Sequence, residues 1–184
     1  GVPTRPETGR AKVDLARMDS SLVRLDARAG ELLGQWRLED RRLSLRHLAW
    51  GSNRLLGIAL QAEHDTPEAK VAAPVLAVFD GNTLTPVFAP QSLAGYGGDV
   101  APIRTAVGHG FAVSCPRVQG IALFTANGEW QGLIPLAEAC ALAATDERVW
   151  AGGQLQALAL QPSMPALSAP ISGLRLDNHW IALP

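Results

Sequence analysis

Long apolar runs are absent from this chain, and so is any strong excess of charge of one sign. No stretch of eighteen consecutive apolar residues occurs among its 184 residues, so we expect no membrane-spanning segment. The formal net charge is −1 and no basic patch stands out, which argues against nucleic-acid binding. Lysine is scarce as well, because only Lys12 and Lys70 of the 16 basic residues are lysines.

Cysteine and the common catalytic motifs are also scarce. The only two cysteines, Cys115 and Cys140, lack the Cys-x-x-Cys spacing of zinc sites. We interpret them as buried thiols on neighbouring strands, with a disulfide as the alternative in an oxidising compartment. Arg117 follows Cys115 closely, but no histidine stands nearby as a base, so we expect no catalytic thiol. No Gly-x-Ser-x-Gly sequence, Walker loop or pair of catalytic carboxylates on one strand is visible.

A secretory signal peptide is not recognisable either. The chain begins at Gly1-Val2-Pro3-Thr4 without an initiator methionine, so we expect it to be processed or truncated. What is present is the composition of a globular protein, with 47% hydrophobic and 18% charged residues. The 18 glycines and 13 prolines are typical of many short strands joined by turns.

A β-hairpin pattern recurs three times, at spacings of roughly fifty residues. Each copy has an apolar strand, a turn rich in Gly, Asn or Asp, and a second strand. The copies are Ser21–Trp36, Pro74–Val87 and Gly120–Ile134. Further apolar strands precede the second and third copies and continue after the third, which indicates repeating units of four strands.

Such units bury their faces only by stacking on one another, as propeller blades do around a central channel. We therefore predict an all-β fold, a β-propeller of four-stranded antiparallel blades. The chain holds roughly three and a half blades, whereas closed propellers have four to eight. The predicted divisions are an irregular arm (1–20), the hairpin of a first blade (21–40), a second blade (43–90), a third blade (96–137), and a fourth blade with a closing strand (138–184).

Some segments are less clearly patterned. Residues 62–73 are predicted as a polar loop, and the prolines within 162–170 predict another. The last strand is expected at Leu174–Leu176 or at His179–Leu183. Residues 136–143 favour a strand from the repeat register, although alanine and leucine leave a short helix as the alternative.

Several short motifs occur in a fixed order along the chain. They include Gly9-Arg10-Ala11-Lys12, Leu43-Ser44-Leu45-Arg46-His47-Leu48-Ala49, Tyr96-Gly97-Gly98-Asp99-Val100-Ala101, Ser114-Cys115-Pro116-Arg117 and Asp177-Asn178-His179. Together they resemble a bacterial family known as domain of unknown function 1513, over nearly all of the chain. The chain differs from the family at Asp99 and at Cys115, where serine is common.

The resemblance implies a seven-bladed propeller, similar to YVTN-type and WD40-like propellers, of which this chain matches the C-terminal half. Family members look like exported, periplasmic proteins, and some occur beside imelysin-like peptidases and genes linked to iron uptake. No reaction is established for the family. From the resemblance we therefore expect a periplasmic location.

The candidate ligand site lies at the mouth of the channel. Alternate residues of an innermost strand face the channel, so either Arg46 or His47 can point there, but not both. Such a group can bind an anion or a metal, whereas the alternative is a structural hydrogen bond to a neighbouring blade. The polar residues assigned to the site are Arg46, His47, Arg117, Asp177, Asn178 and His179. The sequence identifies no cofactor.

Other polar and aromatic residues have plainer interpretations. His64 stands between Glu63 and Asp65 and could bind a metal, but a solvated loop has the same pattern. His109 is predicted in a turn, since glycines flank it. The five tryptophans are expected to pack between blades rather than to form a ligand platform; they are Trp36, Trp50, Trp130, Trp150 and Trp180.

These patterns favour a non-catalytic periplasmic propeller that acts as a binding or scaffold protein, associated with iron or metal uptake. The alternative is a metal-dependent lyase or hydrolase that uses the histidine and arginine groups at the channel mouth. Since a partial propeller exposes open blade faces, the expected partners are the missing N-terminal blades or a second copy of the chain, besides a periplasmic protein partner.

Overall fold

The computed structural model describes residues 6–8, 12, 14–145, 148–161, 167–170 and 177–182. Its strands are β1 (Leu22–Leu25), β2 (Leu32–Trp36), β3 (Leu43–Trp50), β4 (Leu56–Ala62), β5 (Leu76–Phe79), β6 (Leu84–Val87), β7 (Val100–Thr105), β8 (Gly108–Cys115), β9 (Gly120–Thr125), β10 (Trp130–Pro135), β11 (Leu142–Ala144), β12 (Val149–Gly152), β13 (Gln156–Leu160) and β14 (Leu167–Pro170). The short helices are η1 (Pro6–Thr8), η2 (Leu15–Arg17), η3 (Ser52–Arg54), η4 (Pro116–Val118) and α1 (Pro67–Ala72).

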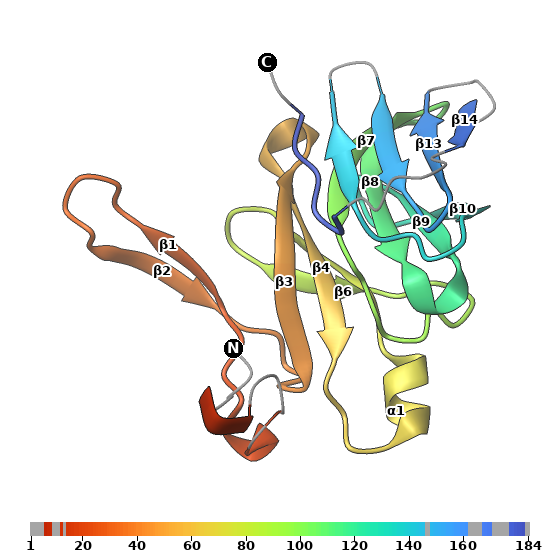
Figure 1. The fold of residues 1–184 in the computed structure, drawn as a ribbon. Coiled ribbons are helices and arrows are strands. Elements are labelled where there is room, and N and C mark those ends of the chain that lie inside the picture. Colours follow the sequence, from red (N-terminus) through yellow and green to blue (C-terminus); the bar gives the residue numbers. More distant parts are fainter. Residues whose placement is uncertain are drawn as a thin grey trace.

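The strands form one two-stranded hairpin and three four-stranded sheets (Figure 1). Each large sheet keeps its strands in chain order, β3-β4-β5-β6, then β7-β8-β9-β10, then β11-β12-β13-β14. All neighbouring pairs are antiparallel. The prediction of an all-β fold built from four-stranded antiparallel units is therefore confirmed.

Three apolar layers hold these units face to face. The first layer lies between the β1–β2 hairpin and the β3–β6 sheet, where the rings of Trp36 and Phe79 pack at 4.6 Å between centroids. The second joins the β3–β6 and β7–β10 sheets around fully buried Phe111 and Phe124. The third joins the β7–β10 and β11–β14 sheets around Leu136 and Val149. Each sheet therefore depends on its neighbours for burial, as expected of propeller blades.

The first strand of each sheet lies beside the first strand of the next. β3 contacts β7, and β7 contacts β11. This row of first strands is where the channel of a closed propeller would run. The tail at residues 177–182 returns to the row, since it lines one hollow together with residues of all three strands.

One glycine shows how closely neighbouring sheets approach. A Cβ atom on Gly57 of β4 would lie 2.5 Å from the Phe111 ring, which belongs to the next sheet. The Phe111 side chain therefore fills the space that any larger residue at position 57 would need. Burying a phenylalanine in this way contributes about 2 kcal/mol.

Two segments predicted as loops contain regular structure. α1 lies within 62–73, and the Thr66 side chain caps it by accepting a hydrogen bond from the Ala69 amide. β14 lies within 162–170, where Pro170 is tolerated because it ends the outer strand of its sheet. Of the two segments expected for the last strand, 174–176 lies outside the described residues, and residues 179–182 form no strand.

Two smaller predictions are also decided. Residues 136–141 form neither a helix nor a strand, and β11 begins at Leu142. The strand predicted over 136–143 is therefore present only at Leu142 and Ala143. His109 lies in β8 opposite Arg104 rather than in a turn. No helix of the described residues is long and apolar enough to cross a membrane.

Candidate functional site

The candidate site begins with a β-bulge in β3. Leu45 of β3 pairs with Leu60 of β4, and Leu48 pairs with Ile58. Two residues of β3, Arg46 and His47, therefore lie opposite a single residue of β4, which is the definition of a β-bulge. Their side chains take separate partners. Arg46 Nη2 lies 3.0 Å from Glu63 Oε1, and His47 Nδ1 lies 3.6 Å from Asp99 Oδ1.

Asp99 links two sheets at this point. Its Oδ1 accepts a hydrogen bond from the Val100 amide at 2.8 Å, and its Oδ2 accepts one from the Leu142 amide at 3.0 Å. Val100 begins β7 and Leu142 begins β11, so one nearly buried carboxylate joins the first strands of adjacent sheets. The same carboxylate faces His47, at a distance beyond that of a hydrogen bond.

His179 of the tail packs against His47. The two imidazole rings lie 4.8 Å apart between centroids, with an angle of 32° between their planes. A hollow of about 340 Å³ lies beside them, lined by His47 and Leu48 of β3, Asp99 and the start of β7, β11, and residues 179–182. Two imidazoles and one carboxylate from distant parts of the chain therefore meet at the row of first strands.

The other predicted site residues lie elsewhere. Arg46 pairs with Glu63, whose side chain is only 3% exposed and also pairs with Lys12. Arg117 stacks on the Tyr96 ring at 4.7 Å and donates a hydrogen bond to the Ala94 carbonyl at 3.1 Å. The charges of both arginines are therefore directed away from the hollow.

Asp177 and Asn178 precede His179 in the tail and are exposed. The charge of Asp177 acts on Cys140, whose thiol pKa is raised above its usual value by burial first, then by Asp99 and Asp177. Burial raises the pKa of the Cys115 thiol to about 12, against a smaller lowering by a backbone hydrogen bond from Ala122. Both cysteines are free thiols, and both are protonated at neutral pH.

Metal binding would have to rely on few protein groups. Among the described residues, no three His, Cys, Asp or Glu side chains are arranged to hold one metal ion. Imidazole is nevertheless a good ligand for transition metals, and the second ring nitrogen of a ligating histidine commonly faces a carboxylate, as His47 faces Asp99. The arrangement can therefore offer two imidazoles, with water or the bound molecule completing the coordination.

Two acidic residues of this region were missed by reasoning from the sequence. Asp99 follows two glycines at the start of a strand, and an ionisable residue entering an apolar strand could have indicated a buried role. Glu63 was considered only beside His64. Its pairing with Lys12 and Arg46 depends on tertiary structure and left no signal in the sequence.

Comparison with known proteins supports the fold. A protein-family model described as "Protein of unknown function (DUF1513)" matches residues 1–183. No curated protein matches the sequence. A structure of streptogramin B lyase is similar with a TM-score of 0.63 and 10% identity, over 83% of this chain and 48% of that one.

Two structures of virginiamycin B lyase from Staphylococcus aureus are similar as well. The selenomethionine-substituted protein has a TM-score of 0.63 and 14% identity, over 86% of this chain and 50% of that one. A catalytically inactive histidine variant with quinupristin has a TM-score of 0.61 and 14% identity, over 84% of this chain and 50% of that one. The chain thus spans about half the length of the propellers that it resembles, and at these identities the likeness concerns the fold alone.

Proposed function

Because the chain belongs to the DUF1513 family, whose function is unknown, we propose a function from the site itself: a non-catalytic binding protein of iron or metal handling. The chain supplies about half of a propeller in this proposal, and the ligand binds at the row of first strands. The observation that carries it is the contact between His47 and His179 beside the 340 Å³ hollow.

The surroundings of these histidines favour binding. Asp99 already accepts two backbone hydrogen bonds, so its carboxylate has a structural role and is not a free base beside His47. A metal ion held by the two imidazoles would keep open positions for a partner or a chelating molecule. We expect the affinity for the ion alone to be in the micromolar range, because only two protein ligands contribute.

The groups near the hollow that could act as nucleophiles argue against catalysis. The Cys140 thiol has a raised pKa, and the Ser114 hydroxyl donates its hydrogen to the Cys140 carbonyl. The carboxylates of Asp99 and Asp177 act on the Cys140 thiol but raise its pKa, which keeps the proton on the sulfur. A covalent mechanism at this place therefore lacks an activated nucleophile.

Elemental analysis and metal titration test the proposal. We expect the purified protein to carry, or to bind at micromolar concentration, iron or another transition metal, and we expect the double variant His47→Ala/His179→Ala to lose that binding. His109→Ala is the matched control, because His109 lies on β8 away from the hollow. A protein that binds no metal, or a double variant that binds as well as the parent, would contradict it.

A metal-dependent lyase or hydrolase is the second candidate. It is favoured by the same pair of histidines, because imidazole can bind a metal and also transfer a proton. The related propellers named as lyases make this candidate worth testing, although the likeness extends only to the fold. Turnover of lyase and hydrolase substrates by the metal-loaded protein would support the enzyme. If the protein binds metal but turns over none of these substrates, the result favours the binding protein.

The proposal includes a periplasmic location and further blades as partners. Among the described residues, β1 pairs only with β2, so its other edge is open. Leu48 and Trp50 of β3 lie on the face that packs against the hairpin, since they pair with buried Ile58 and Leu56, yet they are 53% and 66% exposed. Two more strands beside β1 would cover both side chains and complete the first blade.

Cell fractionation of the natural protein tests the proposed periplasmic location.

A further inference from the structure

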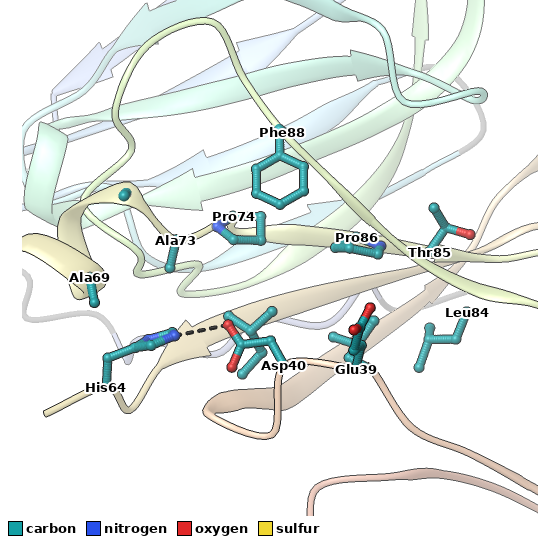
Figure 2. Close-up of a pocket in the computed structure, with 13 residues that line it drawn as sticks. Glu39, Asp40, His64, Ala69, Ala73, Pro74, Leu84, Thr85, Pro86 and Phe88 are labelled. Atoms are coloured by element: carbon teal, nitrogen blue, oxygen red, sulfur yellow. Dashed lines mark hydrogen bonds and ion pairs between the residues drawn. The ribbon is translucent and has the colours of Figure 1, made fainter.

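A second hollow, of about 730 Å³, lies beside the start of β3 and shares none of its described lining residues with the hollow at His47. It is an open hollow between the loop before β3, the helix α1 and the outer strand β6 (Figure 2). Its volume is within the range of small-molecule sites in proteins. Every residue that lines it belongs to the β3–β6 sheet or to the connections of that sheet; they are Leu38, Glu39, Asp40, Leu43, His64, Ala69, Ala72, Ala73, Pro74, Leu84, Thr85, Pro86 and Phe88.

The walls of this hollow are mostly apolar. Figure 2 shows the Phe88 ring across from Asp40 and His64, with Pro74 and Pro86 between them. Phe88 is 66% exposed, so its ring is open to a molecule in the hollow. Exposed aromatic rings beside proline rings offer flat apolar surfaces against which the body of a ligand can pack.

Two carboxylates line the hollow. They belong to Glu39 and Asp40, and no lysine or arginine is among the described residues that line it. Asp40 holds His64 through a contact of 2.8 Å between Oδ2 and Nε2. An ionised carboxylate only accepts hydrogen bonds, so Nε2 of His64 donates the hydrogen of this contact. Oδ1 of Asp40 accepts a second hydrogen bond, from the Arg42 amide at 2.9 Å. No hydrogen bond or ion pair of Glu39 is found within the described part of the chain.

From this combination we propose that the hollow binds an organic cation, an ammonium group attached to an aromatic or aliphatic body. The ammonium group lies against the carboxylates of Glu39 and Asp40, and the body packs on Phe88, Pro74 and Pro86. The site is separate from the His47–His179 contact, so it does not depend on the proposed function.

Titration with three compounds of similar shape tests the proposal. 2-Phenylethylammonium, neutral 2-phenylethanol and anionic 3-phenylpropanoate are each added to the protein and followed by NMR. We expect saturable binding of the ammonium compound, weaker binding of the alcohol, and the weakest binding of the carboxylate. Glu39→Gln should weaken ammonium binding about fivefold, and Phe88→Ala about threefold through the loss of apolar packing.

The matched control is Glu68→Gln, which removes an exposed carboxylate of α1 that does not line the hollow. All three variants change exposed residues, so we expect each of them to fold. The proposal fails if the alcohol binds as tightly as the ammonium compound, which would indicate a merely apolar hollow. It also fails if no saturable binding occurs, or if Glu68→Gln weakens binding as much as Glu39→Gln.

Discussion

Removing the Asp99 carboxylate should weaken the contact between the first strands of two adjacent sheets, β7 and β11, and so destabilise the protein. Its two oxygens accept the Val100 and Leu142 amides at 2.8 and 3.0 Å, and the residue is only 8% exposed. Each buried amide left without an acceptor costs about 1–3 kcal/mol. We therefore expect Asp99→Ala to lower the free energy of unfolding by about 3 kcal/mol, and Asp99→Asn, which keeps one acceptor oxygen, by about half as much.

Urea denaturation measures this loss, and amide hydrogen exchange locates it. The Leu142 amide should exchange faster in Asp99→Ala, because its hydrogen bond to Oδ2 is lost. The control is Asp177→Ala, an exposed carboxylate of the tail, which should change the stability by less than about 0.5 kcal/mol. If Asp99→Ala unfolds at the same urea concentration as the parent, or Leu142 keeps its protection, this carboxylate does not join the two sheets.

The remaining predictions concern association and the two thiols. Leu48→Ser and Trp50→Ser should reduce self-association of the 184-residue chain in sedimentation, because both side chains lie exposed on the side of the β3–β6 sheet that faces the hairpin. A parent chain that sediments as a folded monomer would contradict this. Iodoacetamide at pH 8 should leave Cys115 unmodified in the folded protein and alkylate Cys140 only slowly, and rapid labelling of Cys115 would show that it is accessible. Burial raises the pKa of the Cys115 thiol from 9.0 to about 12, so the stability linked to the protonated thiol is fully present below pH 9 and is lost as the pH rises toward 12. In Cys115→Ala the free energy of unfolding should therefore fall less over this pH range than it does in the parent protein.

Much of the fold could be predicted because hairpins leave local signals. Asp80 at the turn between β5 and β6 accepts hydrogen bonds from the Asn82 and Thr83 amides, and the sequence Asp-Gly-Asn shows this turn chemistry directly. The helix α1 also had a signal, Thr66 followed by Pro67, but the polar composition around it favoured a loop. β14 was harder to predict, because proline near a strand usually indicates its absence.

The site could be predicted only in outline. Alternation along β3 indicated that Arg46 and His47 point to different places, and the structure gives them separate partners. The bulge that arranges this depends on pairing with β4, which no pattern in β3 reveals. The contact of His47 with His179 requires the tail to return to β3, and the stacking of Arg117 on Tyr96 is equally a product of tertiary structure.

The most direct test of the proposed binding site uses the four histidines of the chain as internal probes. Their imidazole signals can be followed by NMR while zinc, as a diamagnetic stand-in for iron, is added to the protein. The proposed site predicts that the signals of His47 and His179 shift together at one micromolar midpoint, while those of His64 and His109 remain in place. Signals of His47 and His179 that do not respond, or that respond only together with those of His64 and His109, would contradict it.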